Sequence, residues 1–145
     1  MTDSIAPLTS APVTFNRSCK VAIIVGSAFA FLSVAIGAFA AHGLKSMLNV
    51  YQLGIFETGA KYQMYHGLAL ILLGLFGMTA RTKVVWSNVG FIAGIVCFSG
   101  SLYLLALLEL RWLAFITPIG GVLLLFGWGT FLFQSSKVMG VQYER

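Results

Sequence analysis

The sequence has very few charged residues. Its 145 residues include nine Lys and Arg and four Asp and Glu, whereas hydrophobic residues make up 59%. An ordinary soluble domain carries about 25% charged residues. A small globule cannot bury this much apolar surface, which argues against a soluble enzyme. The net charge of +5 is spread along the chain. The absence of a basic patch argues against a nucleic-acid-binding protein.

Cysteine is also scarce, with only Cys19 and Cys97. We expect the two thiols to lie at different depths of a membrane, so a disulfide between them is not predicted. Neither has a second cysteine at metal-ligand spacing. The four carboxylates lie outside the apolar runs. No metal site is therefore expected.

Four long apolar runs lie between the charged residues. They cover residues 21–44, 62–80, 84–108 and 112–136, and each is 19 to 25 residues long. A helix needs about 20 residues to cross the hydrocarbon core of a bilayer. The runs are continuous and lack the two-residue alternation of a membrane barrel. The sequence therefore predicts an all-α membrane protein, an antiparallel bundle of four transmembrane helices.

The bundle is expected to cover residues 17–136. Residues 1–16 are predicted to form a mobile N-terminal tail, and residues 137–145 a C-terminal tail. Within the first loop, Glu57 and Lys61 lie four residues apart among apolar neighbours. This spacing predicts a helical extension of the second helix.

Lysine and arginine are unevenly divided between the two sides of the predicted bundle. Six belong to the side of the termini: Arg17, Lys20, Arg81, Lys83, Lys137 and Arg145. Three belong to the other side: Lys45, Lys61 and Arg111. Cytoplasmic segments of membrane proteins carry an excess of lysine and arginine. Both termini are therefore predicted to be cytoplasmic.

Small residues recur at helical spacing along the predicted spans. The first span has a stripe of Gly26, Ala30, Ser33, Gly37 and Ala40. The third has a GxxxG match at Gly90 and Gly94. Such residues let membrane helices approach closely. Folding the chain about Leu110 predicts that Tyr103 lies level with Thr117.

The unusual polar residues gather toward the side of the first loop. At 1.5 Å per helical residue, all of them fall in that half of the bundle, here called the outer half. The candidate ligand-binding residues are His42, Tyr62, Gln63, His66, Ser99, Ser101, Tyr103 and Thr117. Ser99 and Ser101 are about 200° apart around their helix, so they do not form one site.

Each candidate also has a structural explanation. His42 precedes Gly43, where a helix would end, and serine or threonine in a span often bonds to its own backbone. His66 is harder to explain, because an ionisable group within a membrane is costly and often functional. Haem would need both histidines in one cavity, and His42 is predicted to lie too near water. We therefore expect no cofactor. No acid–base pair or activated nucleophile is evident, which argues against an enzyme.

Four local strings together resemble a known family. They are Gly37-Ala38-Phe39-Ala40-Ala41-His42, Thr58-Gly59-Ala60-Lys61-Tyr62-Gln63-Met64-Tyr65-His66, Phe98-Ser99-Gly100-Ser101-Leu102-Tyr103-Leu104-Leu105-Ala106-Leu107, and Thr117-Pro118-Ile119-Gly120-Gly121 followed by Gly127-Trp128. Over about residues 20–135 the chain resembles the YgdD-like family of small inner-membrane proteins, which has mitochondrial relatives. Ala40 stands where the family often has glycine. The resemblance implies a four-helix protein of a bacterial cytoplasmic membrane and supplies no reaction or cofactor.

The sequence leaves three functions open. The first is a non-enzymatic accessory or assembly protein that meets a membrane-protein partner, or a second copy, through its Gly, Ala and Ser faces. The alternative is a protein that binds or transports a small molecule or lipid in the outer polar layer. A haem or quinone redox protein is a third possibility. The lipid bilayer is the expected surrounding, and no nucleic acid is expected.

Overall fold

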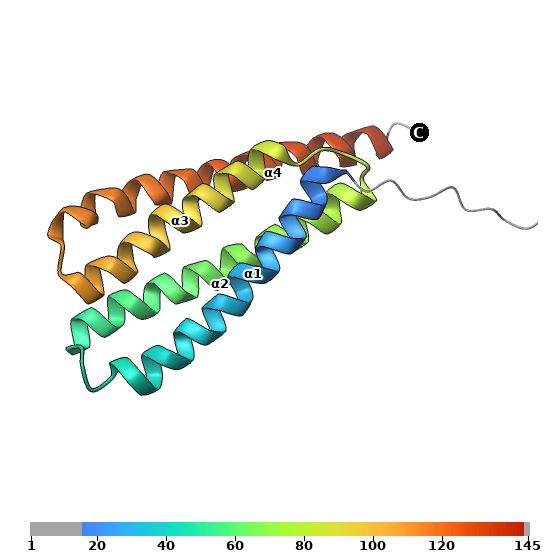
Figure 1. Ribbon diagram of the computed structural model, residues 1–145. Helices are drawn as coiled ribbons and strands as arrows, with labels where there is room; N and C mark the ends of the chain where they lie inside the picture. The colour runs from blue at the N-terminus through green and yellow to red at the C-terminus, as the bar shows by residue number, and fades with distance from the viewer. Residues whose placement is uncertain (1–15, 144–145) are drawn as a thin grey trace, which may run out of the picture.

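The computed structural model describes residues 16–143, and the side chains of residues 16–140. Four long helices follow one another: α1 (Arg17–Phe39), α2 (Val50–Thr79), α3 (Val85–Leu108) and α4 (Ile116–Tyr143). A π-helical turn η1 (Ala40–Leu44) extends α1, and a 3₁₀ turn η2 (Arg111–Phe115) precedes α4. The helices run alternately in opposite directions, and Figure 1 places both ends of the described chain at one end of the bundle. The predicted antiparallel four-helix fold is confirmed.

Within residues 16–143, three helical segments are long and apolar enough to cross a membrane: Arg17–Leu44, Val85–Leu108 and Arg111–Gly140. The helix α2 is 30 residues long but more polar, because it carries Glu57, Lys61 and Gln63 in its first half and His66 just past its middle. It packs along α1 on one side and along α3 on the other. Its apolar second half therefore lies at the same depth as the three spans.

The helices α1 and α2 begin earlier than their apolar runs. At the start of α1, the Asn16 side chain accepts hydrogen bonds from the backbone N–H and the hydroxyl of Ser18, each at 3.1 Å. At the start of α2, Asn49 and Gln52 each accept a bond from the other's backbone N–H, at 2.9 and 3.0 Å. Such capping satisfies the N–H groups that a helix start leaves without partners. The predicted extension of the second helix through Glu57 and Lys61 is present.

The helix α4 extends further than the charge pattern indicates. Residues 137–143, which the sequence assigns to a C-terminal tail, continue the helix. Lys137 does not end α4, because a charged side chain interrupts an apolar run without breaking the backbone hydrogen bonds of a helix. The N-terminal tail expected over residues 1–16 lies, apart from Asn16, outside the described residues.

The register of the α3–α4 hairpin differs from that predicted by folding about Leu110. Thr117 lies beside Ser101, and their hydroxyl oxygens are 2.8 Å apart, so Tyr103 is not its neighbour. Glu109 ends α3 in the left-handed conformation with φ of 54°. The following 3₁₀ turn η2 rises about 2.0 Å per residue instead of 1.5 Å. Thr117 therefore lies further from the turn between α3 and α4 than it would if residues 111–115 were α-helical.

Two close helix crossings are made by facing glycines. A Cβ at Gly26 of α1 would lie 2.6 Å from the carbonyl oxygen of Gly67 on α2. A Cβ at Gly90 of α3 would lie 2.6 Å from the backbone nitrogen of Gly127 on α4. Any side chain would push these backbones apart, so glycine is required at both crossings.

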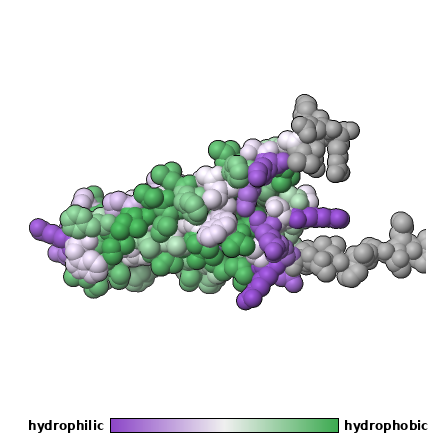
Figure 2. Space-filling model, turned by 90° about the horizontal axis from the view of Figure 1, so that it is seen from above, coloured by the Kyte–Doolittle hydropathy of each residue, from purple (hydrophilic) through white to green (hydrophobic). Residues whose placement is uncertain are grey.

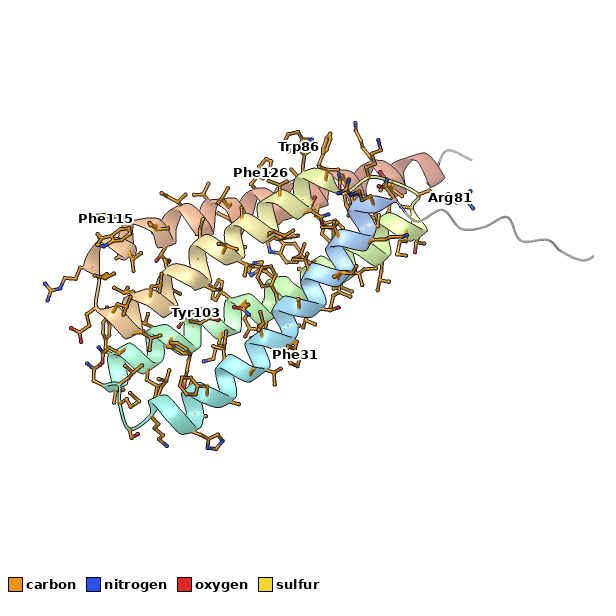
Figure 3. The ribbon with its side chains drawn as sticks, in the orientation of Figure 1. Phe31, Arg81, Trp86, Tyr103, Phe115 and Phe126 are labelled. Carbon is orange, nitrogen blue, oxygen red and sulfur yellow. The ribbon has the colours of Figure 1, made fainter. Side chains whose placement is uncertain are left out.

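The surface of the bundle is apolar along its middle and polar at its ends, as Figure 2 shows for one face. Large side chains such as Phe31, Trp86 and Phe126 are exposed, and Figure 3 labels them on the outside of the bundle. An exposed apolar belt of this extent suits contact with lipid. This arrangement agrees with a membrane-spanning protein.

Candidate functional site

The predicted outer polar layer is divided between separate places in the bundle. His42 belongs to η1, where its side chain is exposed and has no hydrogen bond to another described residue. The remaining seven candidates lie on α2, α3 and α4. Six of them form one network between helices, a second contact between α3 and α4, and one pair beside an open groove, whereas Ser99 stands apart.

The first network joins three helices around Gln63, which is only 4% exposed. Its Nε2 donates to the carbonyl oxygen of Phe29 on α1 at 2.9 Å. The hydroxyl of Tyr103 on α3 donates to its Oε1 at 3.0 Å. Figure 3 shows Tyr103 lying between the ribbons of α3 and α2. Both polar ends of this amide are occupied by protein, so the network holds helices together.

The second contact lies between α3 and α4. The Ser101 hydroxyl is 2.8 Å from that of Thr117 and also donates to the carbonyl oxygen of Phe98. Ser99 is buried elsewhere on α3, and its hydroxyl has no partner among the described residues. The two serines are therefore separated, as their angular positions predict.

Tyr62 and His66 line a hollow in the surface of the bundle. The hollow has a volume of ≈ 480 Å³ and is formed by residues of α2, α3 and α4. Its aromatic lining consists of Tyr62, His66, Phe98 and Trp128. Pro118 and Leu125 of α4 belong to its apolar lining. The lining residues include exposed ones, so the hollow is a lateral groove that faces the surrounding membrane.

Aromatic rings hold His66 in place. Its ring centroid is 5.9 Å from that of Tyr62, 5.8 Å from Phe91 and 6.2 Å from Trp128. Tyr62 also packs against Phe98, with ring centroids 4.6 Å apart. Packed rings of this kind have little freedom to rotate. The imidazole is therefore fixed in one orientation beside the groove.

The hydrogen bond of His66 determines which ring nitrogen remains available. Nδ1 lies 2.8 Å from the carbonyl oxygen of Tyr62. A carbonyl oxygen only accepts, so Nδ1 carries the proton and donates it. In the neutral ring Nε2 is then an acceptor. No described residue bonds to Nε2, and it is not among the fully enclosed polar atoms without a partner.

A second polar cluster, at the end of the bundle that holds the termini, was not predicted from the sequence. The Ser87 hydroxyl is 2.9 Å from that of Thr130 and 3.4 Å from Oε1 of Gln134. Nε2 of Gln134 donates to the carbonyl oxygen of Lys83 at 3.1 Å. Thr130 and Gln134 are four residues apart, which places them on one helix face. The four-residue spacing of Thr130 and Gln134 is the sequence feature that could have indicated this cluster.

Asn88 belongs to the same end of the bundle. It is 5% exposed, and its Nδ2 donates to the carbonyl oxygen of Ser18 at 2.7 Å. Its Oδ1 is enclosed and has no partner among the described residues. This asparagine links α3 to the start of α1 and leaves one acceptor unsatisfied.

The side chains that could hold a metal are dispersed. Within residues 16–143, no three of His, Cys, Asp and Glu come together as a possible metal site. The exposed position of His42 separates it from the enclosed His66. The two histidines therefore do not share a cavity that could hold a haem between them.

Comparison with known proteins shows a family without an assigned activity. The family model described as "Protein of unknown function (DUF423)" matches residues 36–121. A UPF0382 membrane protein of Staphylococcus aureus (strain bovine RF122 / ET3-1) is 43% identical over 83% of this chain and 99% of its own length. One of Staphylococcus epidermidis (strain RP62A) is 46% identical over the same shares.

A third relative, a UPF0382 membrane protein of Staphylococcus saprophyticus, is 47% identical over 82% of this chain and 99% of its own length. No solved structure matches the chain. The family match includes all of α2 and α3 with the end of α1 and the start of α4, and the relatives are described as membrane proteins, in agreement with the fold. The chain therefore belongs to the DUF423 family of membrane proteins of unknown function.

Proposed function

We propose that this protein is a non-enzymatic membrane protein that holds an apolar molecule bearing a hydroxyl group in the groove beside His66. The observation that carries the proposal is that His66 lines a hollow of ≈ 480 Å³ while its Nε2 has no bond to any described residue. A hydroxyl group of the ligand would donate to Nε2. The rest of the ligand would pack against Trp128, Phe98 and Pro118.

The shape of the groove supports a ligand that arrives from the bilayer. Small-molecule sites are typically apolar hollows of about 300–1,000 Å³ with a few well-placed polar groups. This groove has that size, and His66 supplies one directional hydrogen bond. Water is scarce at this depth of a membrane, so an acceptor without a protein partner favours a hydroxyl-bearing ligand.

The proposal can be tested by quenching of Trp128 fluorescence. Trp86 and Trp112 are 65% and 58% exposed and do not line the groove, so Trp86→Phe and Trp112→Phe leave Trp128 as the reporter. The probes are a brominated long-chain alcohol and a bromoalkane of equal length. We expect the alcohol to quench at lower concentration, by about twofold to tenfold, which is the contribution of one hydrogen bond.

The matched variants are His66→Phe and His42→Phe. The first keeps an aromatic ring and removes the acceptor, so the alcohol should lose its advantage over the bromoalkane. The second removes the exposed histidine of η1 and should change nothing. Equal quenching by both probes in the unmodified groove would rule out a hydroxyl-specific site.

The accessory function has less support, because most glycines at the helix faces are used inside the bundle. Gly26, Gly67, Gly90 and Gly127 all lie in crossings between helices of one chain. Gly37, by contrast, has open space where a Cβ would stand. A membrane-protein partner or a second copy would have to use such open positions. Co-purification with a second polypeptide that Gly37→Leu abolishes would favour this function.

The location and orientation also belong to the proposal. The relatives are bacterial membrane proteins, which supports the bacterial cytoplasmic membrane expected from the YgdD-like resemblance. The cations on the side of the termini support cytoplasmic termini. The groove beside His66 would then lie in the half of the bilayer away from the cytoplasm.

A further inference from the structure

The end of the bundle that holds the termini is strongly cationic. Its described cations are Arg17, Lys20, Arg81, Lys83 and Lys137. The two described carboxylates, Glu57 and Glu109, belong to the other end of the bundle. Figure 2 shows the hydrophilic side chains gathered next to the grey terminal atoms. This end therefore offers a positive surface at the level of lipid headgroups.

A second groove lies at this end, between the start of α1 and the start of α3. Its volume is ≈ 590 Å³. Val21, Val89 and Ile92 are among its apolar lining residues, and Arg17 and Lys83 are its two charged ones. It is lined by different residues from the groove beside His66. A site that combines an apolar wall with two cations suits an amphiphile with an anionic head.

Asn88 adds an independent observation at the same place. It lines this second groove, it is only 5% exposed, and its Oδ1 has no partner within the part of the chain that the structure describes. A buried acceptor without a donor is costly, and such groups in folded proteins generally have partners. A hydroxyl of a bound headgroup could donate to this oxygen only after the atoms that enclose it move aside.

We infer that the second groove binds an anionic phospholipid with a hydroxyl-bearing headgroup, namely phosphatidylglycerol. The phosphate lies between Arg17 and Lys83, and an acyl chain follows the wall formed by Val21, Val89 and Ile92. A glycerol hydroxyl donates to Oδ1 of Asn88. A zwitterionic lipid such as phosphatidylcholine lacks both the net charge and the hydroxyl donor.

Native mass spectrometry of the full-length protein tests this inference. The protein in detergent is mixed with equal amounts of phosphatidylglycerol and phosphatidylcholine. The bound lipid is then identified from the mass that it adds to the protein. We expect phosphatidylglycerol to be preferred, and Arg17→Gln with Lys83→Gln to weaken its retention by about fivefold for each cation removed. Lys45→Gln with Lys61→Gln removes the same charge from the other end and should leave the preference intact.

Four results would overturn the inference. Equal retention of the two lipids would show that the groove does not select an anionic head. Unchanged preference in the Arg17→Gln and Lys83→Gln variant would place the lipid elsewhere. Equal retention of phosphatidylglycerol and phosphatidylmethanol, which has the same charge without the hydroxyls, would contradict the role of Asn88. Failure to retain either lipid would contradict the groove as a lipid site.

Discussion

The hydroxyl of Tyr103 donates to Oε1 of Gln63 at 3.0 Å, and this bond joins α3 to α2 within the bundle. Nε2 of the same amide donates to the carbonyl oxygen of Phe29 on α1. The side chain of Gln63 thus connects three helices. Two residues that the sequence marks as candidate ligands are satisfied by each other and by the backbone.

Removing the Tyr103 hydroxyl should destabilise the bundle modestly. Tyr103→Phe leaves Oε1 of Gln63 without its donor while keeping the ring that packs on Phe56, 4.9 Å away between centroids. Hydrogen bonds between membrane helices contribute about 0.6 kcal/mol on average. We expect a loss of that order in the free energy of unfolding, measured by thermal denaturation in detergent. Tyr65→Phe, at an exposed position of α2, is the control.

The contact of Gly26 with Gly67 should be sensitive to any added side chain. Gly26→Leu would place atoms against the backbone of α2, because even a Cβ would lie 2.6 Å from the Gly67 oxygen. We expect a loss of at least about 1–3 kcal/mol, seen as a lower denaturation temperature. Gly37→Leu has open space and should have little effect on the isolated chain. Equal tolerance of both changes would contradict the close crossing of α1 and α2.

The ion pair between Lys61 and Glu57 should contribute little. Nζ and Oε2 are 3.9 Å apart, and the two side chains are 64% and 45% exposed. An exposed pair of this spacing contributes less than about 0.5 kcal/mol. Lys61→Gln should therefore leave the denaturation temperature within error at ordinary salt. A large decrease would show that Lys61 has a role beyond the pair.

The sequence allowed prediction of the helices but not of the faces that meet. Charges such as Arg81 and Glu109 interrupt the apolar runs, and spans of the right length follow from their positions alone. Which side of α2 meets α1 depends on shape, namely on Gly26 fitting against Gly67, and composition does not give that rotation. The 3₁₀ turn η2 shifted the α3–α4 register for a similar reason: the sequence between Arg111 and Phe115 contains no clear signal for it.

The candidate site was predictable in part. The intramembrane position of His66 made it unusual, and the structure places it beside a groove. The same polar layer also contained Gln63, Tyr103, Ser101 and Thr117, which bond to one another or to backbone. Depth along a helix follows from residue number, but direction around the bundle does not. Grouping these residues as one site therefore required a structure to check it.

The orientation can be tested with introduced cysteines. Met47 lies in the turn after η1 and is 75% exposed, and Lys83 is exposed at the opposite end. With cytoplasmic termini, a membrane-impermeant maleimide should label Met47→Cys in intact cells and should label Lys83→Cys only after the membrane is broken. The buried Cys19 and half-buried Cys97 give the background. The reversed pattern would place the termini on the other side.

The central claim is that the groove beside His66 holds a hydroxyl-bearing apolar molecule. Native mass spectrometry of the protein gently extracted from its own membrane tests it most directly. We predict an added mass, identified as such a molecule, that is retained in His42→Phe and falls by about twofold to tenfold in His66→Phe. A bare chain under conditions that preserve bound lipids, or an added mass that His66→Phe retains unchanged, would contradict the account.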